Sequence, residues 1–145
     1  MANASYPAFK QAIGQAGIGN AALDRTSSPV LKLALVTKTA GYTYNTAHDF
    51  HNDLTNIVGT PQAIGSPAFT GSVLDGNDVT FTALSGADVE ALVIYLEFGA
   101  GGTSTWPLVL YLDTGITGVP FTPSGGDVQI QWDNGANKIY NMGGG

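Results

Sequence analysis

The chain has 145 residues, no cysteine, 11% charged residues and a formal net charge of -6. This length predicts one domain with its own core, and the lack of cysteine excludes disulfides, thiolate metal sites and a cysteine nucleophile. The five basic residues lie near the two ends of the chain and form no stripe that neutralises phosphates, so nucleic-acid binding is not expected as a main function.

Membrane insertion and secretion are not expected either. No run of residues approaches the roughly 18 apolar residues that indicate a membrane-spanning helix. The first residues, Met-Ala-Asn-Ala-Ser-Tyr-Pro, lack the basic start and the apolar segment of a secretory signal. The sequence therefore predicts a protein that is made and folded in a cytoplasm.

The first predicted element is a short amphipathic helix over residues 5–15. Apolar side chains at Phe9, Ala12, Ile13 and Ala16 follow the i, i+3, i+4, i+7 spacing of one helical face. A helix with one narrow apolar face must dock on another surface. That surface is either the chain's own sheet or a neighbouring subunit.

A polar segment separates this helix from the first predicted strand. Residues 17–29 are rich in Gly, Asn, Ser and Thr, which favours an extended loop or arm. In residues 30–38 leucine occurs at every second position from 31 to 35, and this alternation predicts a strand with one solvent-facing side. We therefore divide the chain into an N-terminal helix or arm, residues 1–29, and a β-sandwich domain, residues 30–145.

A second short helix is predicted near residues 46–54. Thr46 is suited to cap its N-terminus, because its hydroxyl can accept a backbone hydrogen bond of the first turn. Ala47, Phe50 and Leu54 would then share its buried side.

Six further segments have the alternation or the apolar composition of β-strands. They are residues 69–74, 79–83, 88–98, 106–113, 127–132 and 138–140. The longest, residues 88–98, is apolar on both alternating faces, as expected of a strand buried on two sides. A Gly-rich loop predicts a hairpin between this segment and the next, and Asp133-Asn134-Gly135 predicts a hairpin between the last two.

The number and spacing of these segments define the expected fold class. Counted with the first strand, they give about seven or eight short strands with turns about every eight to twelve residues. The sequence therefore predicts an all-β protein, an antiparallel β-sandwich of Greek-key or jelly-roll type, with the two short helices described above.

His48 and His51 are the two histidines of the chain and the candidate metal ligands. On a helix they would share a side, and two imidazoles with a third ligand can hold zinc. The sequence offers no third ligand at a fixed spacing. Solvent or backbone partners are the alternative for both, so we assign neither a metal nor a cofactor.

Paired acidic residues are the other candidates for chemistry. Asp88 and Glu90 lie on one side of a strand, as a glycosidase pair would, but they begin that strand beside a turn, where solvated carboxylates are common. Asp75, Asn77 and Asp78 resemble part of a calcium loop, but the position of Gly76 and the lack of a later bidentate Glu break that pattern, and a simple β-turn is the alternative. No nucleophile elbow or phosphate-binding glycine motif occurs. We therefore predict no catalytic residue and no enzymatic activity.

Aromatic residues suggest an alternative function. Tyr42 and Tyr44 lie in a polar Gly-Tyr-Thr-Tyr-Asn stretch that favours exposure, and exposed rings can form a platform for a sugar. Together with the loop of residues 99–106 they would make the chain a glycan-binding module.

Several phrases distributed along the chain form a signature. They are the opening Met-Ala-Asn-Ala-x-Tyr and residues 33–44, 78–83, 90–95 and 125–140. In these phrases, which together extend over nearly the whole chain, the sequence resembles a family of small virion structural proteins of tailed bacteriophages.

The resemblance implies a head decoration, or cement, protein that binds the outside of an assembled icosahedral shell after synthesis in the host bacterial cytoplasm. Its partners would be the major capsid protein and further copies of itself, and its location the capsid surface of the virion. A position in the tail or neck is the alternative. The anchoring contacts are assigned to N-terminal side chains, namely Tyr6, Phe9, Ile13, Ile18, Leu23 and Arg25.

Overall fold

The computed structural model describes residues 3–10, 30–39, 41–70, 72–98, 102–135 and 138–141. In these ranges the regular elements are β-strands, two short 3₁₀ helices and one helical turn at residues 7–10, and the rest is loops and turns. The 3₁₀ helices are η2 (His51–Asp53) and η3 (Thr103–Thr105). None of the helical segments described is long and apolar enough to cross a bilayer.

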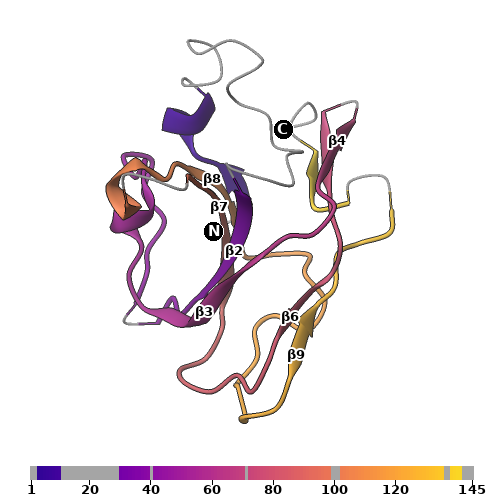
Figure 1. Cartoon of the computed structure of the whole chain (residues 1–145). Helices are drawn as coiled ribbons and strands as arrows, with labels where there is room; N and C mark the ends of the chain where they lie inside the picture. Colours follow the sequence, from indigo (N-terminus) through magenta and orange to yellow (C-terminus); the bar gives the residue numbers. More distant parts are fainter. Residues whose placement is uncertain are drawn as a thin grey trace.

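The larger sheet has five antiparallel strands (Figure 1). In spatial order they are β1 (Ala4–Ser5), β8 (Leu108–Leu112), β7 (Ala91–Glu97), β2 (Val30–Val36) and β3 (Ile57–Ala63). The central strand β7 corresponds to the longest predicted segment. Its antiparallel pairing with β8 confirms the hairpin that the Gly-rich loop predicts.

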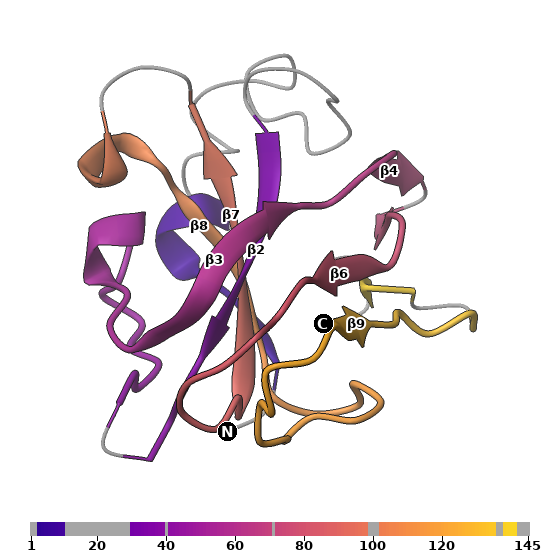
Figure 2. The ribbon, with the colours of Figure 1, turned by 60° about the horizontal axis from the view of Figure 1, so that its bottom comes forward.

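Two smaller antiparallel sheets lie to one side of the larger one (Figures 1 and 2). One has the spatial order β10 (Tyr140–Asn141), β5 (Val73–Asp75) and β4 (Ala68–Thr70), and the other pairs β6 (Val79–Phe81) with β9 (Val128–Ile130). The chain is therefore an all-β protein with antiparallel sheets in a sandwich-like arrangement, as the sequence predicts.

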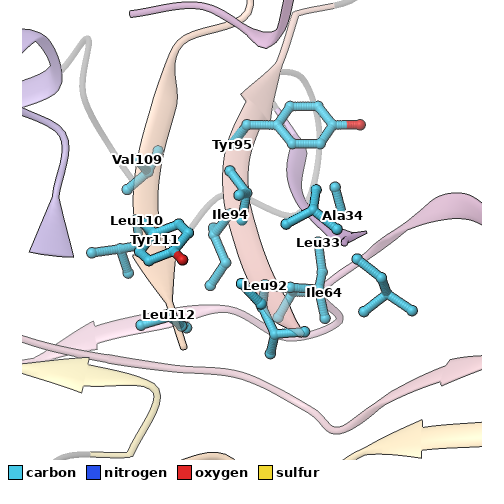
Figure 3. Packing of buried hydrophobic residues seen from close by; sticks show 14 of the residues in the cluster. Leu33, Ala34, Ile64, Leu92, Ile94, Tyr95, Val109, Leu110, Tyr111 and Leu112 are labelled. Carbon is cyan, nitrogen blue, oxygen red and sulfur yellow. The ribbon is translucent and has the colours of Figure 1, made fainter. Parts of the chain in front are cut away.

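The core surrounds β7 on both faces. Residues 91–96 of this strand are each at most 2% exposed, so the absence of a polar face in the sequence matches the burial of both sides. Leu92 and Ile94 lie on one face, where they pair with Leu112 and Leu110 and approach Ile64 (Figure 3). On the other face, Val93 pairs with Tyr111, and the N-terminal segment and the residues around 41–54 cover it.

The sequence does not predict β3, because its residues, Ile-Val-Gly-Thr-Pro-Gln-Ala, contain two strand breakers. The structure accommodates both of them. β3 is the outer strand of the larger sheet, and its register with β2 shifts between Leu33 and Leu35, so that Gly59, Thr60 and Pro61 face the gap. A glycine with φ of 70° and a proline are tolerated at such an edge bulge, because a regular ladder bond is not required there.

The segment predicted as one strand over residues 69–74 is a hairpin instead. β4 and β5 pair antiparallel and are joined by residues 71 and 72, and Ser72 has φ of 68°, as a tight hairpin turn requires. The sequence favours one continuous strand here, because Phe69 and Val73 are apolar residues on either side of the break.

The hairpin predicted between the last two strands is wrong. β9 pairs with β6 and β10 pairs with β5, so the Asp-Asn-Gly sequence connects two different sheets. Trp132 gives the physical reason, because its backbone N–H donates to Asp78 Oδ1 and its indole N–H donates to the carbonyl of Asn77, both at 3.0 Å. These bonds hold Trp132 beside residues 77 and 78, in the connection between β5 and β6.

The helix predicted near residues 46–54 is present only as η2. Asn45 Oδ1 accepts the backbone N–H of Ala47, a side-chain turn that competes with a helix start at Thr46. Leu54 is buried as predicted, but Ala47 is exposed, so the predicted buried face forms only in part.

Residues 3–10 belong to the larger sheet and its core. β1 pairs with β8, the N–H of Tyr6 donates to the carbonyl of Val109 at 3.0 Å, and residues 7–10 form a helical turn. The remainder of the predicted N-terminal helix and arm, residues 11–29, lies outside the described residues.

Candidate functional site

A chain of three hydrogen-bonded side chains lies under the segment that contains the predicted metal ligands. The hydroxyls of Tyr6 and Tyr42 are 2.6 Å apart, and the Tyr42 hydroxyl is 2.9 Å from Nδ1 of His48. Tyr6 and Tyr42 are 0% and 1% exposed. The three groups join the N-terminal segment to the stretch after β2, so their first consequence is structural.

Aromatic rings surround this hydrogen-bonded chain. The ring of Tyr44 lies 5.2 Å from the rings of both Tyr6 and Tyr111, and Tyr111 lies 6.2 Å from Tyr42, centroid to centroid. These are distances at which tilted aromatic pairs attract. We call Tyr6, Tyr42, Tyr44, Tyr111 and His48 the tyrosine cluster.

Burial raises the pKa values of the phenols in the tyrosine cluster. Desolvation raises the pKa of Tyr42 to about 12, although the hydrogen bond from Tyr6 opposes the shift. The pKa of Tyr6 rises further, through burial and the bond to Tyr42, and burial also raises that of Tyr111. Phenols with raised pKa values are poor proton donors at neutral pH, so the cluster has the properties of a packing and hydrogen-bonding unit.

Tyr42 cannot serve as a sugar platform, because it is 1% exposed. The prediction that Tyr42 and Tyr44 lie on the surface is wrong for Tyr42 and only partly right for Tyr44, which is half-buried against two other rings. The polar sequence around them is misleading, because neighbouring residues face solvent while the rings point inward.

His48 and His51 do not converge on a common point. His48 bonds Tyr42, whereas the ring of His51 lies edge-on to Tyr95 at 4.5 Å and to Trp106 at 5.6 Å. Burial lowers the pKa of His51, against the raising effect of Glu97. The shared helical side that the metal hypothesis needs is absent, because His48 precedes η2 rather than lying on it.

The described ranges contain no group of three or more His, Cys, Asp or Glu side chains placed to hold a metal ion. The loop aspartates have other partners: Asp75 Oδ1 accepts the N–H of Gly76 at 2.8 Å, and Asp78 holds Trp132. Residues 76–78 form a connection between β5 and β6, which belong to different sheets, and not the turn that the sequence predicts.

Asp88 and Glu90 also act separately. Asp88 Oδ1 accepts the hydroxyl of Thr122 at 2.8 Å. Glu90 Oε1 accepts the backbone N–H groups of Lys38 at 3.0 Å and Thr39 at 2.8 Å, which lower the Glu90 pKa against a smaller effect of desolvation. The two carboxylates thus fasten different loops and share no substrate position.

Asp113 carries a carboxylate that is almost fully enclosed. Its side chain is 1% exposed, and Oδ2 accepts from Lys38 Nζ at 3.0 Å and from the Tyr111 hydroxyl at 3.1 Å. Burial acts to raise the Asp113 pKa, but these bonds outweigh it and the pKa is lowered. Asn3 Oδ1 accepts the backbone N–H groups of Asp113 and Thr114, which fixes the end of β8 to the N-terminal segment.

Carboxylates therefore share one role across the fold, which is to accept hydrogen bonds from loop backbones and from neighbouring side chains. The donors of Asp53 and Asp75 lie within four residues of them. The sequence does not reveal the role of the others, because each of them has a partner far away along the chain. The acidic residues with such contacts are Asp53, Asp75, Asp78, Asp88, Glu90, Glu97, Asp113 and Asp127.

The predicted partner-binding residues fall into two groups. Tyr6 and Phe9 are 0% and 4% exposed, so in the described structure their side chains pack within the chain's own core. Ile13, Ile18, Leu23 and Arg25 lie outside the described residues.

Two depressions in the described surface are open and shallow. One, of about 290 Å³, is lined by Ala68, Thr70, Val73, Asp75 and Lys138, beside strand β4. Another, of about 250 Å³, lies between β3 and the turn after β6. Neither contains a pair of side chains arranged for acid–base chemistry.

Comparisons with known proteins were made at three levels. No family model, no curated protein and no solved structure matches the chain.

Proposed function

We propose that the chain is a non-enzymatic structural protein of a tailed-bacteriophage virion, a capsid decoration protein that binds the outer shell and bridges capsomers. The sequence phrases that resemble this family coincide with main elements of the fold. They include β2, β6, β7 and β9, so the resemblance concerns the scaffold.

The observation that carries the proposal is that the acidic side chains have structural partners within the chain. Eight acidic side chains fasten loops or strand ends through hydrogen bonds and ion pairs. Such bonds to charged groups are stronger than neutral ones, and they stabilise one arrangement of the loops. A fixed surface carried by a stable core suits a protein that must fit many identical positions on a shell.

The proposed mechanism is mechanical. Each copy would contact adjacent capsomers through modest interfaces, and many copies would add their contacts to resist internal pressure. The major capsid protein is the proposed partner, and the N-terminal segment beyond residue 10 is the proposed anchor. A tail or neck position remains the alternative within virion structure.

Copy number separates the shell from the tail or neck. Purified particles that contain the chain should be resolved by gel electrophoresis, and its band compared with that of the major capsid protein by densitometry. Shell decoration predicts on the order of hundreds of copies per particle, because icosahedral symmetry repeats the site. A count on the order of ten would move the protein to the tail or neck.

A matched pair of variants tests the anchor. Replacing Ile13, Ile18, Leu23 and Arg25 together with serine should abolish binding to shells that lack the protein, while residues 3–10 keep the fold intact. The control replaces four exposed side chains elsewhere, Thr80, Thr82, Gln129 and Gln131, with serine. Cosedimentation with shells and thermal melting are the measurements, and unchanged binding by the first variant would contradict the anchor assignment.

A further inference from the structure

Among the described residues, strand β4 is an unpaired sheet edge with an apolar residue at its centre. It is the outer strand in the order β10-β5-β4, and Ala68, Phe69 and Thr70 are all exposed. Among the described residues Phe69 is the one large hydrophobic side chain classed as exposed, at 39%. Figures 1 and 2 both place β4 at the periphery of the molecule. Natural sheets usually protect such an edge with a charge, a proline or a covering segment, and β4 itself carries neither charge nor proline.

The direction of the free backbone groups on β4 follows from its neighbours. Phe69 lies opposite Leu74 in β5, and the carbonyl of Leu74 accepts the N–H of Ile139 at 3.0 Å on the other side, toward β10. In an antiparallel ladder a residue whose carbonyl points away from its partner strand belongs to a non-hydrogen-bonded pair. The N–H and C=O of Phe69 therefore also point away from β5, to the open edge.

We propose that β4 is a self-pairing edge, at which two copies of this chain join antiparallel about a two-fold axis through Phe69. Each Phe69 would donate its N–H to the carbonyl of the other, which satisfies both outward backbone groups at once. The product is one continuous sheet in the order β10-β5-β4-β4-β5-β10. This inference is independent of the virion role proposed above.

The side chains around β4 favour a second copy as the occupant. The two-fold arrangement sets Phe69 beside its equivalent, and cross-strand aromatic pairs are favourable. It also sets Ala68 opposite Thr70, two small side chains that let the strands approach. The depression on that face carries one acid and one base, Asp75 and Lys138, so the patch has no local excess of one charge to repel its equivalent.

The size of this contact sets the expected strength. Three residues from each copy make an interface smaller than the roughly 1,200 Å² of stable complexes, so association should be weak and concentration-dependent. When many copies are held close together, the same contact is strengthened by the high effective concentration.

Sedimentation of the purified full chain over a wide concentration range is the first test. The wild type should change from monomer toward dimer as concentration rises. Phe69→Lys should raise the dissociation constant on the order of tenfold or more, because a charge at an edge opposes strand pairing. Thr80→Lys adds the same charge at an exposed position of β6 and should leave the dissociation constant unchanged.

A cysteine variant provides a second readout, because a disulfide traps even a weak or short-lived contact covalently. The chain has no cysteine, so Phe69→Cys introduces a single thiol. A hydrogen-bonded antiparallel pair has Cα atoms about 5.5 Å apart, inside the range of about 4.4 to 6.8 Å for disulfides. Mild oxidation should convert Phe69→Cys to a covalent dimer, and should leave Thr80→Cys monomeric over the same period.

Two results would overturn the inference. In the first, the wild type stays monomeric at all concentrations and position 69 shows no preferential crosslinking. A different protein would then be the partner of the β4 edge. The other is a dimer that Phe69→Lys does not weaken, which would place the contact elsewhere. Circular dichroism of each variant ensures that only folded chains are compared.

Discussion

Tyr42 connects separate parts of the chain through one hydroxyl group. It bonds the hydroxyl of Tyr6 on the N-terminal segment and Nδ1 of His48 beyond β2, and its ring touches Tyr111 on β8. The residue is 1% exposed, so water does not readily replace a lost partner. We therefore expect the Tyr42 hydroxyl to contribute to the stability of the fold in addition to its ring.

We expect Tyr42→Phe to lower the free energy of unfolding by about 1 to 3 kcal/mol, because the buried Tyr6 hydroxyl loses its partner. Urea denaturation followed by fluorescence measures the change. Tyr44→Phe is the matched control, since that residue contributes its ring to the cluster and should change stability by no more than about 0.5 kcal/mol. Equal losses in the two variants would show that the hydroxyl chain contributes nothing beyond ring packing.

Asp113 makes stability depend on pH. Its pKa lies below the ordinary value of 3.8 in the folded chain, since bonds to Lys38 and Tyr111 outweigh burial. A carboxyl whose pKa is lower in the folded state stabilises fully above its unfolded pKa, and this stabilisation is lost as pH falls through the folded pKa. The relevant window therefore begins near pH 3.8 and extends downward.

Asp113→Asn should lower the free energy of unfolding at pH 7 by about 1.5 to 3 kcal/mol, because it replaces hydrogen bonds to a buried charge. The difference from the wild type should shrink below pH 3.8, where the wild-type carboxyl also becomes protonated. Glu97→Gln is the control: its ion pair with Lys32 is a quarter exposed and should contribute no more than about 1 kcal/mol. Denaturation curves from pH 2 to 7, roughly, measure both. A difference that is constant with pH would contradict this assignment.

At the scale of single elements, β7 is the strand on which most packing depends. Ile94 at its centre is 0% exposed and lies opposite Leu33 in β2 and Leu110 in β8. Both neighbouring strands lose contacts if this side chain is replaced. A polar side chain at the middle of β7 could not reach solvent, because both faces of the strand are buried.

Ile94→Asp should therefore leave no folded protein, because it buries a charge without a partner. Ile94→Val is the control and should cost about 0.5 to 1.5 kcal/mol. Soluble yield and near-ultraviolet circular dichroism distinguish the two. A folded Ile94→Asp protein would mean that the centre of β7 is less enclosed than it is here.

The elements differ in how well their sequences predict them. β7 and β8 are predicted because two apolar faces leave little choice but a buried strand. β3 is not, because Gly59 and Pro61 exclude a regular strand and only the edge position and the bulge against β2 permit one. The hairpin predicted at residues 133–135 fails for a similar reason, since bonds from Trp132 to the distant residues 77 and 78 override the local turn signal.

At the scale of the whole molecule, the fold class could be predicted but the site could not. Strand number and turn spacing are local properties, so they indicate an all-β sandwich. The tyrosine cluster depends on contacts between residues such as Tyr6 and Tyr42, which lie 36 positions apart, and no spacing rule brings them together. The same holds for the carboxylate contacts, for example Asp127 with the N–H of Ala83 across 44 positions.

The division of the chain at residue 29 can be tested through residues 3–10, which act as part of the larger sheet. Deleting residues 2–10 removes β1 from the edge of β8 and takes Tyr6 and Phe9 out of the core, so we expect a loss of more than about 4 kcal/mol. Lys10→Ala, at an exposed position of the same segment, should change stability by less than about 0.5 kcal/mol. Thermal melting and urea denaturation measure both variants. A deletion that melts like the wild type would make the N-terminal segment a separable arm, whereas the expected collapse would restrict any arm to the residues beyond position 10.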